Sequence, residues 1–159
     1  MDTLELHKVL VPKEDHRRLL RAMYSEDAPL LSTFHQNAGQ GLDACVDTTL
    51  SQISEGSKFY KVEMPDGTLL GYFVVALPVE GTDVMEGFFI RVQFRQQIYK
   101  DAFINLINST FDNDFFTSTG ANNYRAINFL LKYNFQLYNS NFEFNNKSLV
   151  ILKASNTKN

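Results

Sequence analysis

The stretch from Glu86 to Phe111 holds the residues whose types and spacing best suit a binding site. It begins with the apolar run 87–90, which is typical of a strand buried on both faces, and passes through the polar turn 95–97. It continues as an amphipathic helix, with an apolar face made of Ile98, Tyr99, Ala102, Phe103, Leu106 and Ile107. Because the first N–H groups of a helix have no intrahelical acceptor, this stretch predicts a site for an anion such as a phosphate.

A second stretch, late in the chain, places the first in a family context. Asn123, Ala126, Leu130 and the pair 134–135 follow the spacing Asn-x-x-Ala-x-x-x-Tyr-x-x-x-Gly-Phe. This pattern resembles the acetyl-CoA-binding motif of GNAT-superfamily N-acetyltransferases. Leu130 stands at the usual Tyr position and Asn134 at the usual Gly position. Asn tolerates the left-handed backbone of a helix C-cap, so the second replacement is physically mild.

The stretch from Glu86 also resembles a GNAT motif, the pyrophosphate loop, which consists of a hydrophobic strand, Arg-x-x-Gly-x-Gly/Ala and a helix. Arg95 stands at the Arg position, whereas Ile98 and Lys100 stand at the two glycine positions. Glycines there let the backbone approach the pyrophosphate closely, and bulky side chains crowd it. Two adjustments remain open: Ile98 could point into the core, and Lys100 could attract a phosphate by its charge.

The resemblance implies acetyl-CoA as the cofactor. Backbone groups of Ile90 and Val92 would bind its pantetheine arm as an added strand. The remaining expected cofactor-binding residues are Arg95, Gln96, Gln97, Ile98, Tyr99, Lys100 and Asn123.

The resemblance also implies two proton-transfer roles. Glu86, just ahead of the central strand, is the candidate base that takes a proton from the amine, and the alternative is a solvated strand-end glutamate. Tyr133, near Leu130, is the candidate acid for the thiolate, and the alternative is a core or surface tyrosine. The three histidines match no metal-ligand spacing, so no metal site is expected.

The elements around these residues predict one α/β domain over residues 1–154 and a flexible tail over 155–159. Their order is strand, two helices, three strands, helix, strand, helix and two strands, which is the order of the GNAT fold. We expect a single GNAT-like domain with a mixed, splayed sheet of about seven strands and helices on both faces. Turns are expected at Pro65-Asp66-Gly67 and at Asn145-Asn146.

Composition excludes several other classes of protein. The 159 residues carry a net charge of −3, so bulk electrostatics does not favour a nucleic-acid partner. A single cysteine, Cys45, excludes an intramolecular disulfide, and no apolar run approaches the length of a membrane span. The expected location is the cytoplasm, or a virion if the protein is phage-encoded.

Three interpretations of function follow. The first is an N-acetyltransferase that moves acetyl from acetyl-CoA to a small-molecule or protein amine. The second is a catalytically inactive GNAT-fold protein that binds a protein partner or acyl-CoA. The stretch from Asn123 to Lys132 resembles GNAT-like phage proteins, including internal virion proteins. The third is an α/β domain unrelated to that family.

Overall fold

Seven strands form one mixed sheet in the computed structural model, which describes residues 4–26, 41–144 and 147–156. They are β1 (His7–Leu10), β2 (Lys58–Glu63), β3 (Leu69–Val75), β4 (Asp83–Ile90), β5 (Phe115–Gly120), β6 (Gln136–Phe144) and β7 (Lys147–Ala154). Their order across the sheet is β1-β2-β3-β4-β5-β7-β6. All neighbouring pairs are antiparallel except β4 and β5, which are parallel. The expected mixed sheet is confirmed.

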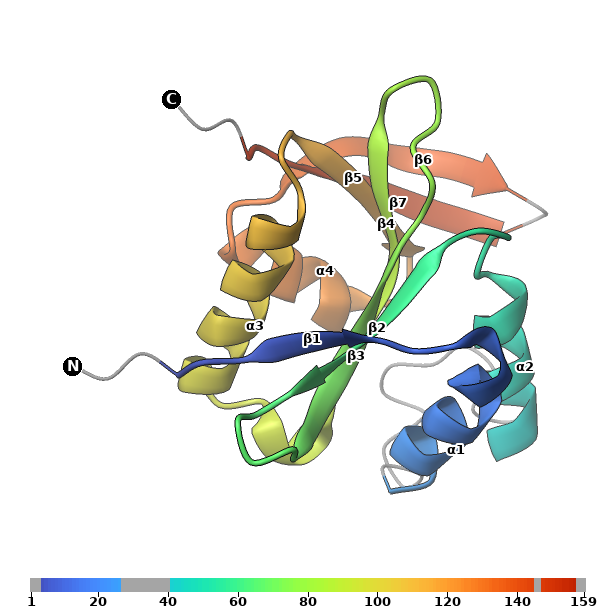
Figure 1. The fold of residues 1–159 in the computed structure, drawn as a ribbon. Helices are drawn as coiled ribbons and strands as arrows, with labels where there is room; N and C mark the ends of the chain where they lie inside the picture. Colours follow the sequence, from blue (N-terminus) through green and yellow to red (C-terminus); the bar gives the residue numbers. More distant parts are fainter. Residues whose placement is uncertain (1–3, 27–40, 145–146, 157–159) are drawn as a thin grey trace.

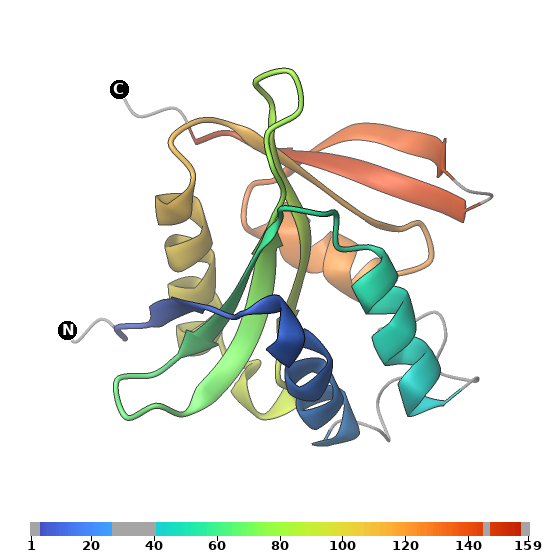
Figure 2. The same cartoon turned by 45° about the vertical axis from the view of Figure 1, so that its right-hand side comes forward.

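Helices cover both faces of this sheet, as the sequence predicts (Figure 1). The α-helices of the described part are α1 (His16–Glu26), α2 (Leu42–Ser51), α3 (Gln97–Thr110) and α4 (Tyr124–Lys132), and two short 3-10 helices are η1 (Lys13–Asp15) and η4 (Val92–Phe94). In Figure 1, α1 and α2 lie on one side of the twisted strands and α3 and α4 on the other, and Figure 2 shows α1 and α2 side by side. The element order is the one expected from the sequence.

The core between the sheet and α3 is mainly aromatic and aliphatic. Phe103 of α3 is fully buried, with its ring edge-on to Phe73 of β3 at a centroid distance of 6.3 Å. Leu130 of α4 is fully buried in the same core. Phe88 of β4 stacks on Phe129 of α4, with centroids 5.6 Å apart. The strand, α3 and α4 therefore form one packed unit.

The core under α1 and α2 contains a polar cluster. The Tyr24 hydroxyl lies 2.9 Å from the Thr49 hydroxyl and 2.8 Å from the Tyr72 hydroxyl. Burial raises the pKa of Tyr24 and raises that of Tyr72 well above its ordinary value. Phe89 of β4 packs edge-on to Tyr24, at 5.3 Å between centroids. The two faces of β4 thus belong to two different cores.

Local sequence signals agree with the ends of α4. Asn123 caps its start, with Oδ1 accepting from the Ala126 amide at 3.2 Å. Asn134, at φ 70°, follows its end in the left-handed conformation. The amide of Phe135 donates to the Leu130 carbonyl at 3.0 Å, as in a Schellman C-cap. Asparagine therefore performs the turn that glycine would provide.

Two expectations concern the end of the chain. The turn at Asn145-Asn146 lies outside the described residues. The tail predicted over 155–159 is described only through Asn156, whose amide donates to Asp114 at 2.6 Å. The side-chain amide of Asn156 donates to the carbonyls of Asn108 and Phe111. This described part of the tail is held against the end of α3.

Candidate functional site

β4 and β5 separate part-way along their length. They pair only where Asp83–Met85 lies beside Phe115–Thr117. Beyond this point β4 stays paired with β3 as far as Ile90, and β5 stays paired with β7 to its end. At the last paired position the Thr117 hydroxyl donates to a β4 carbonyl, that of Met85, at 2.9 Å. The expected splay is therefore present, and it opens toward the carboxyl ends of both strands.

An extra residue in β4 lies at the point of separation. Gly87 faces Val74 of β3, whereas Met85 faces the next residue, Val75. Glu86 is therefore the additional residue of a β-bulge. Because a bulge bends the strand that carries it, β4 can leave β5 while keeping its pairing with β3.

Beyond the bulge, one edge of β4 faces the opening. The Arg91 amide donates to the Leu70 carbonyl of β3 at 2.9 Å. Backbone groups alternate in direction along an antiparallel strand, so those of Phe88 and Ile90 point away from β3. The Ile90 carbonyl accepts from Arg95 Nε at 2.8 Å. This edge is the expected site for a ligand that binds like an added strand.

Val92, predicted to extend this edge, belongs instead to a turn. It begins η4, and its carbonyl accepts from the Arg95 amide at 3.3 Å. The expected strand geometry at Val92 is therefore wrong, because the chain turns immediately after Arg91. The edge that faces the opening ends at Ile90.

The first turn of α3 begins at Gln97, and only Arg95 and Gln96 separate it from η4. Gln96 precedes the helix, and its carbonyl accepts from the amides of Tyr99 and Lys100, both at 3.1 Å. The Ile98 side chain is 54% exposed, so the suggestion that it points into the core is wrong. Because Ile98 is the second residue of α3 and is exposed, it lies beside the N–H groups that would meet an anion. Tyr99 is half-buried and packs edge-on to Phe94, at 5.2 Å between centroids.

Arg95 folds back onto the strand. Besides its bond to the Ile90 carbonyl, its guanidinium lies 5.4 Å from the centre of the Phe89 ring. Its charge therefore lies against β4. This arrangement ties the turn before α3 to the end of the strand.

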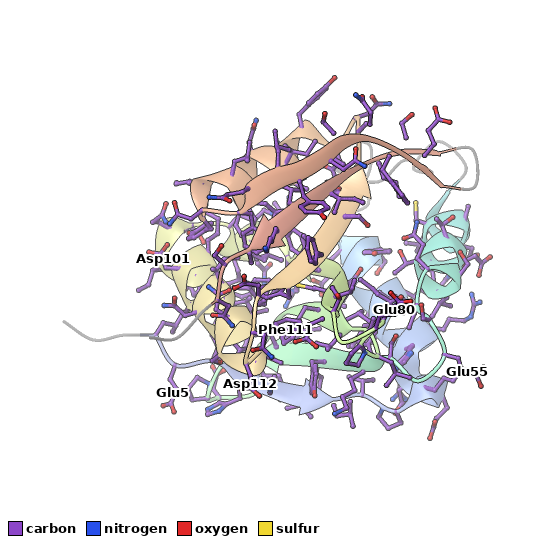
Figure 3. The ribbon with its side chains drawn as sticks, turned by 90° about the horizontal axis from the view of Figure 1, so that it is seen from above. Glu5, Glu55, Glu80, Asp101, Phe111 and Asp112 are labelled. Carbon is purple, nitrogen blue, oxygen red and sulfur yellow. The ribbon has the colours of Figure 1, made fainter. Side chains whose placement is uncertain are left out.

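Polar side chains join the start of α3 to the end of α4. Gln97 Nε2 donates to the Tyr133 hydroxyl at 2.8 Å and to Asp101 at 2.5 Å. The Tyr133 hydroxyl donates to Asp101 Oδ1 at 2.5 Å, and Lys132 donates to Gln97 Oε1 at 2.8 Å. Asp101 lies on the α3 side of the molecule in Figure 3.

These contacts shift the pKa values of both acids. Burial raises the pKa of Tyr133, and the hydrogen bond to the charged Asp101 raises it further. The same hydrogen bond, followed by that from Gln97, lowers the pKa of Asp101. Tyr133 therefore keeps its proton and already donates it to a carboxylate.

Glu86 lies on the face of β4 that is opposite α3 and α4, where residues of the loop after α2 bind its side chain. Its carboxylate accepts from the Ser54 amide, at 3.2 Å to each oxygen. It also accepts from the Ser54 hydroxyl and, at 2.5 Å, from the Ser57 hydroxyl. The half-buried Glu86 is thus a bound carboxylate at the origin of the opening.

The structure places most of the predicted residues along the opening between β4 and β5, and the other two, Asn123 and Tyr133, at the two ends of α4. Ile90, Arg95 and the residues 96–100 follow one another along the opening, with Glu86 at its origin. Asn123 lies at the end of β5, where its side-chain amide donates to Thr119 at 3.2 Å. Tyr133 reaches the first turn of α3 through Gln97.

Five hydrogen-bond partners of these residues were missed in the sequence: Ser54, Ser57, Asp101, Thr119 and Lys132. The spacing Ser-x-Gly-Ser predicts a turn, but no sequence signal indicates its partner. No cluster of residues suited to hold a metal ion occurs in the ranges 4–26, 41–144 and 147–156, and no helix described there is long and apolar enough to cross a membrane.

Comparisons by sequence and by structure differ sharply. No protein-family profile matches the sequence, and no curated protein matches it significantly. Solved structures do match. An acetyltransferase from Thermus thermophilus superposes with a TM-score of 0.71 and 14% identity, covering 98% of this chain and 99% of that one.

Two further structures extend this match. A probable GNAT-family acetyltransferase from Chromobacterium violaceum gives a TM-score of 0.70 at 12% identity, covering 98% of this chain and 85% of that one. Spermidine N-acetyltransferase from Vibrio cholerae, solved with CoA and spermine, gives a TM-score of 0.63 at 12% identity, and the match covers 96% of each chain. The chain has the GNAT fold. At these identities the match establishes the fold and leaves the chemistry to the site.

Proposed function

We propose that this chain is an N-acetyltransferase that binds acetyl-CoA in the opening between β4 and β5. The observation that carries the proposal is the backbone edge of Phe88 and Ile90, beside a β5 that has already separated. A pantetheine arm contains amide groups that can bond to such an edge, as an added strand does. The likeness to a spermidine N-acetyltransferase solved with CoA supports this assignment.

Glu86 is the proposed proton acceptor. Bound acetyl-CoA would supply an activated acetyl group, and the amine nitrogen would bond to its carbonyl carbon as the carbon–sulfur bond breaks. The nitrogen loses one proton and the thiolate gains one. Glu86 lies where the opening begins, and a carboxylate there can take the first proton directly or through water. The acceptor is a small-molecule or protein amine.

Tyr133 is the proposed donor of the second proton. Leu130, at the position where the family has tyrosine, carries no proton to give and is fully buried. The Tyr133 hydroxyl donates to Asp101 in the described structure. Donation to sulfur therefore requires the hydroxyl to leave that carboxylate first.

Isothermal titration with acetyl-CoA tests the proposal. Because Ile98 and Lys100 stand at the glycine positions of the motif, we expect weak binding, with a Kd above about 100 μM. This Kd corresponds to a binding free energy of less than about 5.5 kcal/mol in magnitude. Lys100 should contribute by charge, so Lys100→Ala should weaken binding and added salt should have the same effect. Lys13→Ala, an equal change of charge on the exposed η1, is the control.

The outcomes separate two functions. Micromolar or tighter binding unaffected by Lys100→Ala would show that the turn acts through its backbone, and would strengthen the enzyme proposal. Absence of binding would favour a second function, a GNAT-fold protein that binds a partner without catalysis. That alternative is favoured by Leu130, buried where the family has its proton donor.

A further inference from the structure

The loop between α2 and β2 contains a tight turn of defined geometry. The Ser57 amide donates to the Ser54 carbonyl at 3.1 Å, which closes a four-residue β-turn. Gly56 occupies its third position at φ 84°, a backbone conformation that favours glycine. A Cβ on Gly56 would lie 2.6 Å from Leu77 Cδ1. The turn therefore places its first and fourth side chains, both serines, on one side.

Both serines of this turn donate hydrogen bonds to the same carboxylate, that of Glu86. Each oxygen of Glu86 accepts from one hydroxyl, Oε2 from Ser54 and Oε1 from Ser57. The Ser54 amide lies 3.2 Å from both oxygens. Glu55, between the two serines, lies on the side of the molecule opposite Asp101 in Figure 3. The carboxylate is thus bound from one face of the sheet, away from the contacts between α3 and α4.

Glu86 is also the residue that redirects the backbone of β4. Before it, the Val84 carbonyl accepts from the Ala76 amide on the β3 side at 2.9 Å. After it, the Arg91 amide donates to the Leu70 carbonyl of β3. Val84 and Arg91 are an odd number of residues apart, and in a regular strand they would face opposite sides. The bulge reverses this alternation.

The reversal decides what the opening can bind. Because of it, the backbone groups of Phe88 and Ile90 face the opening, while those of Gly87 and Phe89 bond to β3. We propose that Ser54 and Ser57 are positioning residues, which hold the bulge at Glu86 and so fix the edge of β4 that binds acetyl-CoA. The cofactor part of this statement rests on the proposed function.

The double variant Ser54→Ala/Ser57→Ala tests the proposal, because it leaves the Glu86 carboxylate in place. Hydrogen exchange of the free protein reports on the bulge without any ligand. We expect the Gly87 and Phe89 amides to exchange about tenfold faster, and acetyl-CoA to bind about tenfold more weakly. Ser51→Ala is the matched control, since its hydroxyl bonds to the Thr48 carbonyl within α2.

Ser57→Thr keeps a hydroxyl at the same position and should restore both readouts relative to the single change Ser57→Ala. The single change also serves if the double variant does not fold. Native exchange rates in the alanine variants would overturn the proposal. Faster exchange with unchanged acetyl-CoA affinity would overturn the positioning role. The serines would then only stabilise the local structure around Glu86.

A native protein that binds no acetyl-CoA would refute the proposed function instead. The exchange measurement would still decide whether the serines hold the bulge. Failure of the inference and failure of the proposed function are therefore distinguishable.

Discussion

The two parts of the proposed acetyl-CoA site differ in the groups they offer. Along β4 the proposed binding groups are the main-chain N–H and C=O of Phe88 and Ile90, and every amino acid except proline carries both. At the start of α3 the proposed binding groups are also main-chain, but access to them depends on the side chains of Ile98 and Lys100. The first part therefore tolerates change of sequence, and the second does not.

This difference explains how the chain can have the GNAT fold although no family profile matches its sequence. The edge of β4 needs a bulge and a separated neighbour, and both are backbone features. The turn before α3 has no glycine, and Arg95 lies against the strand there. Changing each part separately should show which one dominates ligand binding.

The largest effect is expected where α3 is attached to the sheet. Phe103 is fully buried and its ring contacts Phe73 and Phe88. Phe103→Ala should lower the free energy of unfolding by about 3–5 kcal/mol, measured by urea denaturation. Ile98→Ala on the same helix is the control and should cost less than about 0.5 kcal/mol. A loss below about 1 kcal/mol for Phe103→Ala would mean that α3 does not depend on this contact.

The next effect concerns the spacing between β3 and β4. A Cβ on Gly71 would lie 2.0 Å from the Phe89 carbonyl oxygen, which is a backbone atom. Gly71→Ala should therefore cost about 1–3 kcal/mol or more, because β4 must shift. A Cβ on Gly87 would meet nothing within 4 Å, so Gly87→Ala is a matched control. Equal unfolding midpoints for the two variants would contradict the close approach.

Much of the fold follows from local sequence signals. The cap at Asn123 and the left-handed Asn134 each depend on residues within a few positions. The spacing of apolar residues around Phe103 likewise indicates which face of its helix is buried. A glycine inside a strand, such as Gly71, also predicts a bulge or a close backbone approach, and both are found: Gly71 lies close to the Phe89 carbonyl, and the pairing of β2 with β3 shifts register beside it. Short-range patterns therefore predict the elements and their order.

The details of the site depend on contacts distant in sequence. Glu86 binds Ser54, 32 residues away, and no residue type marks an inserted bulge residue. The exposure of Ile98 depends on η4, which sets where α3 begins. Tyr133 meets Asp101 because α4 packs beside α3. These features emerge only when the elements are assembled.

A moderate effect is expected from placing glycine at two positions in the first turn of α3. In Ile98→Gly/Lys100→Gly the backbone N–H groups become accessible, and the lost Ile98 side chain is already 54% exposed. The variant also loses the Lys100 charge, but the gain in backbone access should outweigh that loss, so acetyl-CoA affinity should rise by about tenfold, or about 1.4 kcal/mol, in isothermal titration. Glycine in a helix costs up to about 1 kcal/mol per position, so the unfolding midpoint should fall.

Ile98→Ala/Lys100→Ala is the control for side-chain removal without glycine. Equal affinities for the alanine and glycine variants would show that crowding, rather than backbone conformation, limits the turn. An unchanged affinity in both would show that the edge of β4 alone determines binding.

The smallest effect should come from Tyr133→Phe, which removes the hydroxyl between Asp101 and Gln97. The pKa of Asp101 is lowered in the folded protein, so its contribution to stability is present above its ordinary pKa of 3.8 and is lost as pH falls through the lowered value. The pKa of Tyr133 is raised, so its contribution is present below its ordinary pKa of 10.0 and is lost above it, as pH rises through the raised value. The native protein should therefore exceed the variant in Tm at neutral pH, by about 2 °C or less, and the difference should shrink below pH 3.8 and above pH 10.0. Tyr138→Phe, on a ring that is 66% exposed on β6, is the control and should show no such dependence. A Tm difference that stays constant across this range would mean that the contact contributes by packing alone, and that the link between α3 and α4 does not depend on charge.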